Sequence, residues 1–310
     1  MVCKLTNIKI WRLLVFSALF LLQYENSMTQ NHQLAGFSYI FYPNSGLKDD
    51  ARDTKFAFQE YGGFVKIPYR FKNKKTIIVN GLSYACLYGY ISNHSIKYDG
   101  DNTEKLQFLT FQTIVAHKLR DDLNIVFSLR PTIASDFEER LSWDDFIMQG
   151  FLFLSKQHSE NLSIGLGLAN TIRLGKTLVI PIIPFRYTKN KHSLNTMLPL
   201  KLDYIYCIDH NEKLKMGFRE TVNGGNINIT ASYNANSTIP EIDKINYSRI
   251  NLSPVFYYNI TKYIQIEILG GISIRRRYNL LDIEGTTHKM YLKEAPFLQL
   301  GMFFTPPKNK

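Results

Sequence analysis

The sequence predicts an all-β protein, an antiparallel transmembrane β-barrel of about 12 strands within a range of about 10–14. Three observations predict this fold. The chain begins with a short apolar segment, apolar residues alternate with polar or small ones along most of its length, and the last strand ends in an aromatic residue. The 19 Tyr and 21 Phe suit strands and membrane–water interfaces.

The N-terminus predicts a secretory signal peptide over residues 1–29, cleaved near residues 27–29. Lys4, Lys9 and Arg12 precede the ten-residue apolar run Leu13–Leu22. A basic start followed by a short apolar run is typical of a signal peptide, and this run is too short to span a bilayer. The alternative is a buried N-terminal helix of a cytosolic protein. Residues 30–310 are then the barrel.

Charge and cysteine content exclude two classes of function. The formal net charge is +11, and removal of the signal peptide, with three bases and one acid, leaves +9. No basic helix, RNP-type motif or zinc-finger spacing accompanies this charge, which argues against nucleic acid as a partner. Cys86 and Cys207 remain after cleavage, without metal-ligand spacing. Two free thiols are favoured over a disulfide between them.

Period-two alternation is the strongest pattern. In residues 123–134, 162–169 and 263–269, apolar residues occupy every second position, against polar or small residues between them. Successive strand side chains point to opposite faces, so each segment has one apolar face. That face would point inward in a soluble sandwich and toward lipid in a barrel.

Strand length and loop length favour the barrel over the sandwich. Predicted strands such as 55–70 and 76–90 are far longer than the roughly 5–6 residues usual in soluble sheets. Short turns alternate with longer polar loops, as between periplasmic and external ends. The predicted short turns are 72–75, 119–122, 157–161, 188–193 and 259–262, with 173–177 as an exception because a long loop is expected there. The predicted long loops are 44–54, 92–104, 136–145, 233–244 and 276–289.

The strand count leaves one ambiguity. The predicted strands are 34–42, 55–70, 76–90, 105–118, 123–135, 146–156, 162–172, 177–187, 194–208, 213–232, 245–258, 262–275 and 290–304. These are thirteen, whereas bacterial single-chain barrels have even numbers. A reversal at Pro199 would give fourteen strands, and fusion of two strands would give twelve. We prefer twelve.

The last strand resembles the assembly signal of outer-membrane barrels. In residues 297–304 a polar residue, a glycine and a terminal aromatic follow at the characteristic spacing, namely Gln299, Gly301 and Phe304. The resemblance implies recognition by the barrel assembly machinery. The tail 305–310 departs from the pattern, because such strands usually end the chain.

The chain also resembles an uncharacterised family of outer-membrane barrels from Bacteroidetes, the DUF6268 type. The alternating strands, the segment Leu178–Pro184, and Met197–Pro199 followed by Leu202–Tyr204 carry this resemblance, which covers residues 34–304. It implies a barrel in the cell outer membrane, with outer-membrane lipid and lipopolysaccharide as partners. It implies no activity and no functional residue.

Alternation places four ionisable residues inside the predicted barrel: Arg130, Lys201, Asp203 and Glu267. They either pair and plug the lumen or line a path for solutes, and pairing is preferred because a barrel of about 12 strands is narrow. Arg275, Arg276 and Arg277 begin a predicted external loop. They are candidate lipopolysaccharide contacts, since guanidinium groups bind phosphate well, or a solvated cluster.

The sequence contains no recognisable catalytic, cofactor or metal site. His94 with Ser95, and Asp144 with Asp145, fall in external loops, but no nucleophile, base and orienting group can be assembled. Gly224 and Gly225 suggest a strand kink or bulge. A structural, passive-transport or surface-interaction role is therefore expected. The alternatives are a barrel enzyme acting on lipid or peptide and a soluble secreted β-sandwich binding protein.

Overall fold

The computed structural model describes residues 33–48, 55–92, 103–209, 211–229 and 242–306. The predicted signal peptide lies outside these residues, as does His94. Within the described ranges, no helix combines the length and apolar character that a membrane crossing requires.

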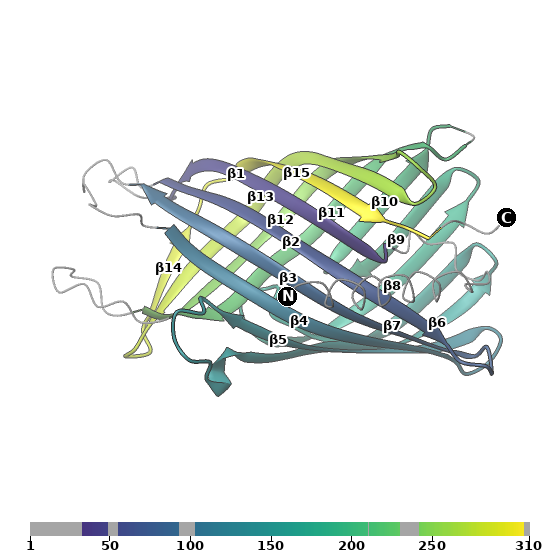
Figure 1. Cartoon of the computed structure of the whole chain (residues 1–310), viewed down its shortest axis with the longest axis horizontal. Helices are drawn as coiled ribbons and strands as arrows, with labels where there is room; N and C mark the ends of the chain where they lie inside the picture. Colours follow the sequence, from purple (N-terminus) through teal and green to yellow (C-terminus); the bar gives the residue numbers. More distant parts are fainter. Residues whose placement is uncertain (1–32, 49–54, 93–102, 210, 230–241, 307–310) are drawn as a thin grey trace, which may run out of the picture.

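One β-sheet contains all the described strands, and it closes on itself (Figure 1). Each strand pairs antiparallel with the next along the chain from β1 to β13. The ring is completed by β15, which pairs with both β13 and β1. The strands are β1 (Ala35–Gly46), β2 (Lys55–Arg70), β3 (Thr76–Ser92), β4 (Thr103–Lys118), β5 (Leu123–Ser135), β6 (Phe146–Ser159), β7 (Leu162–Thr171), β8 (Leu178–Lys189), β9 (His192–Leu198), β10 (Lys201–Cys207), β11 (Leu214–Asn228), β12 (Ile242–Asn259), β13 (Ile264–Asp282), β14 (Thr287–Tyr291) and β15 (Ala295–Phe304).

The barrel wall has 14 strands, so the preferred count of twelve is wrong and the alternative of fourteen strands is confirmed. The predicted strand 194–208 is two strands, β9 and β10, which reverse at Pro199 and Leu200; the Leu200 amide donates to the Met197 carbonyl at 2.8 Å. In contrast, β14 and β15 form a single wall strand. They keep one register against β13, since Tyr291 faces Arg277 and Ala295 faces Ser273.

Short and long connections segregate to opposite ends of the barrel. At one end, named the turn end here, short turns join β2–β3, β4–β5, β6–β7, β8–β9, β10–β11 and β12–β13. The other end, the loop end, carries the longer loops, but also the short β7–β8 connection and the β9–β10 reversal. The predicted loop 276–289 is wrong: β13 runs to Asp282 and pairs with β14 there.

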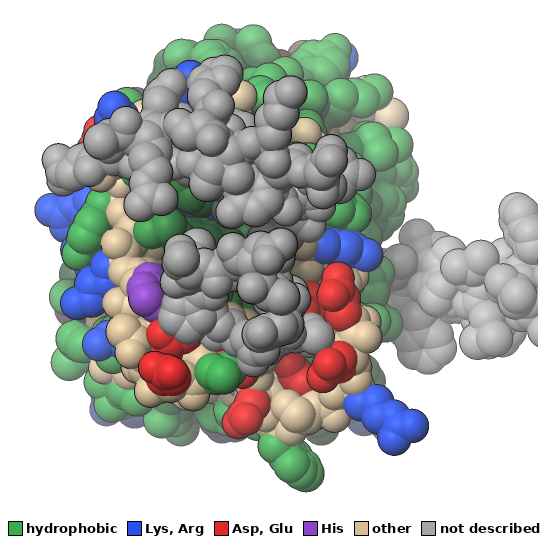
Figure 2. Space-filling view, turned by 90° about the vertical axis from the view of Figure 1, so that its left-hand side faces the viewer, with side chains coloured by type: hydrophobic (Ala, Val, Ile, Leu, Met, Phe, Trp, Pro, Cys, Tyr) green, Lys and Arg blue, Asp and Glu red, His purple; other side chains and the backbone are tan. Residues whose placement is uncertain are grey.

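Apolar side chains cover the outside of this wall. In β15, Leu298, Leu300 and Met302 are 46–56% exposed, while Phe297 and Phe303 on the other face are buried. The same alternation leaves Leu166 and Val179 two-thirds exposed on neighbouring strands β7 and β8. Figure 2 shows apolar side chains around the perimeter of the barrel at one of its ends. A soluble sandwich would bury this face against a second sheet, so that alternative is wrong.

The lumen is closed by side chains near the loop end. There β11 extends past the short β10, and its last residue Asn228 bridges Ser135 of β5 in a parallel pair. At this level the ring of paired strands passes directly from β5 to β11 without β6–β10, so the ring is narrower here. The space inside is filled by buried, mostly apolar side chains of the remaining strands, a cluster named the loop-end plug here: Tyr42, Phe56, Phe58, Leu87, Leu106, Ala134, Ile227, Ile245, Tyr278 and Leu292.

A second apolar cluster lies on the other side of β11 and β12. Val222 and Ile250 alternate with the inward-facing Thr221 and Asn251, so they point away from the lumen. They pack with buried Ile182 of β8 and Leu200 of the β9–β10 reversal. The outer parts of β6–β9 therefore overlap the back of β11 and β12. Gly224 permits this close approach, because a β-carbon there would collide with the backbone oxygen of Arg173 in the β7–β8 turn.

The Gly224–Gly225 pair contains no bulge, since β11 and β12 keep one register through it. Gly225 faces the lumen, where a β-carbon would meet the rings of Tyr247 and Phe108 at 2.7 and 2.8 Å. Both glycines thus serve close packing rather than a change of register. Cys86 and Cys207 are free thiols.

Adjacent glycines in β13 offer a matched test of wall packing. A β-carbon at Gly271 would collide with the Leu252 backbone oxygen and lie 2.8 Å from Ser253 Cα, whereas at Gly270 the nearest atom is 3.8 Å away. We expect Gly271→Ala to lower the free energy of unfolding by about 1–3 kcal/mol. Gly270→Ala should change it by less than about 0.5 kcal/mol. Urea titration in lipid vesicles measures both, and equal stabilities would contradict the packing described for β12 and β13.

Candidate functional site

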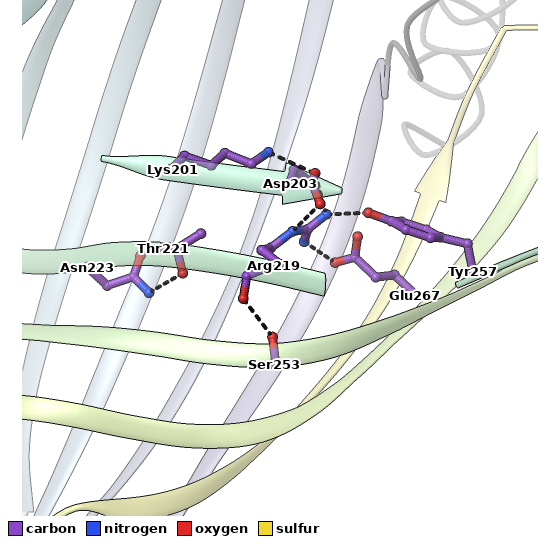
Figure 3. A network of polar contacts seen from close by, with 8 residues as sticks. All are labelled: Lys201, Asp203, Arg219, Thr221, Asn223, Ser253, Tyr257 and Glu267. Carbon is purple, nitrogen blue, oxygen red and sulfur yellow. Dashed lines mark hydrogen bonds and ion pairs between the residues drawn. The ribbon is translucent and has the colours of Figure 1, made fainter. Parts of the chain in front are cut away.

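Charged side chains meet inside the barrel around Arg219 of β11 (Figure 3). Its guanidinium donates to both carboxylate oxygens of Asp203 on β10, at 3.3 and 3.1 Å, and to Glu267 on β13 at 3.0 Å. The two carboxylates are 6% and 2% exposed. Buried carboxylates need such partners, because an unpaired buried charge is costly.

Two more residues complete this network. The Tyr257 hydroxyl of β12 accepts from Arg219, and the Lys201 ammonium lies 3.3 Å from Asp203. Ser253 donates to the Arg219 carbonyl at 3.5 Å. Three of the four residues predicted to face the lumen, Lys201, Asp203 and Glu267, are thus brought together. The pairing links β10, β11 and β13 along one side of the wall and does not bridge the lumen.

Arg219 itself was not among the predicted lumen residues. Its strand was predicted over residues 213–232, but no face was assigned to it. The signal was present: Leu214, Met216 and Phe218 alternate with Lys215, Gly217 and Arg219. That alternation places Arg219 on the polar face, together with the inward-facing Lys215.

A cavity of about 280 Å³ lies in the lumen between this network and the loop-end plug. Its polar wall includes Arg173, Arg219 and Arg249, with Glu60 as the acidic residue. Ile40, Leu269 and Phe297 supply an apolar wall. The volume is near the lower limit of small-molecule pockets, which hold roughly 300–1,000 Å³.

Arg249 of β12 is fixed in the wall of this cavity. It is 5% exposed, forms an ion pair with Glu60 of β2, and stacks over the rings of Tyr42 at 4.2 Å and Tyr247 at 5.3 Å. Its Nε atom has no hydrogen-bond partner among the described residues. A rigidly held guanidinium with an unused N–H donor can bind an anionic group at little cost in side-chain entropy.

Arg130 of β5, the fourth predicted lumen residue, does not join the network. Its positive charge repels that of Arg173 and also that of Lys66 on β2. Within the described part of the chain, neither Arg130 nor Arg173 forms an ion pair with a carboxylate. This side of the lumen therefore carries uncompensated positive charge.

The lumen lining as a whole has an excess of positive charge. By alternation and register, basic residues outnumber acidic ones at inward-facing strand positions of the described chain. The basic residues are Lys66, Arg70, Lys118, Arg130, Arg186, Lys201, Lys215, Arg219, Arg249 and Arg276, and the acidic ones are Glu60, Asp203, Glu267 and Asp282. A lining of this kind attracts anions and repels cations.

The predicted lipopolysaccharide contacts lie in β13 rather than in an external loop. The strand has a bulge there: the pairing to β12 shifts between Ser248 and Ile250, and Arg275 has a φ of 49°. Arg276 turns inward, is 3% exposed, and donates to Ser45 and to the Lys293 carbonyl. Only Arg275 and Arg277 remain exposed.

The other predicted residues take structural positions. Gln299 and Gly301 face inward in β15, and Phe304 faces outward, where its ring stacks on Tyr263 at 6.0 Å. Asp145 accepts from the Ser142 amide at 2.7 Å and caps the short helix η2 (Trp143–Asp145). In the described residues, no group of three or more His, Cys, Asp or Glu side chains could hold a metal ion.

The closed antiparallel sheet, its apolar outer face and its charged interior define a β-barrel of the kind found in outer membranes. The chain belongs to the DUF6268 family, a domain of unknown function, which matches residues 26–305. The predicted family is confirmed; a Bacteroidetes origin stays a prediction. A comparison with curated proteins gives no match.

Solved structures of outer-membrane barrels are similar to this chain. The deltaS2S3 mutant of the monoaromatic hydrocarbon channel TodX shares 10% identity, with 88% of this chain and 89% of that one covered and a TM-score of 0.44. The NanC porin shares 10% identity over 87% and 99% of the two chains, with a TM-score of 0.32. A Pseudomonas aeruginosa FadL homologue shares 10% over 87% and 89%, with a TM-score of 0.32. At such identities, function must be argued from the residues of this chain.

The Arg219 network predicts an unequal response to loss of its two cations. Arg219→Gln leaves two buried carboxylates without their main partner, so we expect unfolding free energy to fall by about 3–5 kcal/mol. Lys201→Gln removes a cation whose side chain is 37% exposed, and should cost less than about 1 kcal/mol. Urea titration in lipid vesicles compares the two. A similar small loss for both would show that Arg219 does not hold the carboxylates.

Proposed function

We propose that this protein is an outer-membrane barrel of the passive-transport type, and that its lumen passes small anionic solutes. The observation that carries the proposal is the excess of inward-facing basic residues in the described chain, among them Arg130, which forms no ion pair with a carboxylate there. A purely structural wall would be expected to balance its buried charges, because each uncompensated one destabilises the fold. A solute path gains from such charges, since they raise the local concentration of anions.

Membrane location and orientation belong to the proposal. The outward apolar face supports burial in lipid, and only a closed sheet pairs all its backbone groups there. Short turns at one end and longer loops at the other support a periplasmic turn end and an external loop end. Export by a cleaved signal peptide and insertion by the barrel assembly machinery, which would recognise Gln299, Gly301 and Phe304, complete this interpretation.

Lipid partners follow from the same orientation. Exposed Arg275 and Arg277 lie in the part of β13 nearest the loop end, where lipopolysaccharide phosphates would be within reach. Arg277 is stacked over Tyr291 of β14 at 5.9 Å, which holds its guanidinium near the wall. Arg276 has no part in this contact, because its side chain is buried.

The loop-end plug acts in this proposal as a closed gate. Tyr42, Phe56 and Phe58 are 0–4% exposed and fill the ring at that end. A solute that enters from the turn end must pass the buried side chains of Tyr257 and Gln265 to reach the cavity, and it then stops below the plug. Passage then requires these side chains to move, so conductance through the resting barrel should be small. A transport role of this kind needs no catalytic residues, and we propose none.

Conductance across a planar lipid bilayer tests the proposal. In a KCl gradient the reversal potential of the wild type should show a preference for chloride. Arg130→Gln removes an unpaired inward charge and should reduce this preference, whereas Arg275→Gln, which changes an exposed outward charge, should leave it unchanged. Phe58→Ala should raise the conductance, because it opens the plug, while Phe41→Ala on the outer face should not.

Two results would contradict anion transport. One is a cation preference in the wild type. The other is the absence of any conductance in both the wild type and Phe58→Ala, provided that both migrate on gels as folded, heat-modifiable barrels. The second result would favour a structural role, in which the inward charges only stabilise the wall.

A further inference from the structure

Two residues that line the cavity below the plug have buried polar atoms without hydrogen-bond partners in the described chain. Arg249 Nε is buried without a partner, although the residue is 5% exposed. Asn251 donates to the Tyr42 hydroxyl at 2.7 Å, but its Oδ1 atom has no partner within the described chain. Both residues line the cavity. Buried polar atoms normally find partners, so the unpaired Arg249 donor at the cavity wall points to a ligand that accepts a hydrogen bond there. Asn251 Oδ1 is an acceptor and needs a donor, so it does not itself argue for an anion.

Charge at the cavity selects the chemistry of that ligand. Arg219 is neutralised by Asp203 and Glu267, and Arg249 faces Glu60. Arg173 remains, as a third guanidinium at the wall without a carboxylate partner in the described residues. Arg130 lies near enough for the two positive charges to repel each other. A single anionic group in the cavity would relieve this repulsion, and it would accept a hydrogen bond from Arg249 Nε.

Shape and lining argue for an organic anion rather than an inorganic one. The cavity volume of about 280 Å³ exceeds that of one water by roughly ninefold. Opposite the arginines, Ile40, Leu269 and Phe297 present apolar surface. A fully solvated inorganic ion would leave this surface wet, whereas a short hydrocarbon body would cover it.

We infer that this cavity is a binding site for a small organic carboxylate, whose charged group contacts Arg173 and Arg249 and whose apolar part packs on Leu269 and Phe297. The inference rests on the proposed anion path, because the ligand enters through the lumen. It goes further than that path, since a site that holds its solute makes transport saturable and selective for organic acids over inorganic anions.

Calorimetric titration of the full chain in detergent, without a membrane, tests the site separately from transport. The probes are butyrate, its neutral isostere butyramide, and inorganic phosphate. Butyrate should bind saturably, and at least tenfold more tightly than butyramide or phosphate. Arg173→Gln should weaken butyrate binding at least tenfold, whereas Arg275→Gln should leave it unchanged. Heat-modifiable migration on gels confirms that each variant is folded.

Several outcomes would overturn the site. They are the absence of saturable butyrate binding, equal binding of butyramide, tighter binding of phosphate, or unchanged binding in folded Arg173→Gln. The comparison of ligands uses the wild type alone, so it decides the question even if the variant does not fold. A barrel that conducts anions in bilayers but binds no butyrate would refute this site and leave the proposed function standing.

Discussion

Closure of the sheet is the constraint on which the rest of the structure depends. An apolar surrounding offers no partner for a free backbone amide or carbonyl, so a membrane-spanning sheet cannot have an edge. In this chain the requirement is met where β15 pairs with β13 on one side and with β1 on the other. Once the ring is closed, each strand has one face outside and one inside. The sequence must then place apolar side chains on the first and smaller, polar or charged ones on much of the second.

The short β9–β10 hairpin has consequences far from its own residues. Because β10 begins only at Lys201, which faces Thr221, the part of β11 beyond Thr221 has no β10 neighbour and reaches β5 instead. The ring narrows, aromatic residues fill it, and β6–β9 overlap the back of β11 and β12. The same narrowing leaves the cavity between the plug and the Arg219 network. The short hairpin thus accompanies both the packed loop end and the charged cavity next to it.

Much of the fold could be predicted from the sequence, because period-two alternation reports directly on a wall with two different faces. The faces of 123–134 and 297–304 and the inward positions of Lys201, Asp203 and Glu267 were predicted in this way. Other features depend on events that alternation does not report. The reversal at Pro199 is so short that the alternation continues across it. Proline there indicates a reversal as one alternative, but the alternation does not decide between fourteen strands and the wrongly preferred twelve. The bulge at Arg275 shifts the phase within one strand and turns Arg276 inward. Contacts between distant strands, such as Arg249 with Glu60, arise only from closure.

The most direct test asks whether the alternating faces lie in lipid and in the lumen. After cleavage of the proposed signal peptide, Trp143 is the one tryptophan that remains, so Trp143→Phe gives a background without tryptophan fluorescence. In that background, Leu166→Trp probes an outward position that is 66% exposed, and Phe153→Trp probes an inward one. In vesicles of lipids brominated on their acyl chains, the account predicts strong quenching for Leu166→Trp and little for Phe153→Trp. Equal quenching at both positions, or the reverse order, would contradict it.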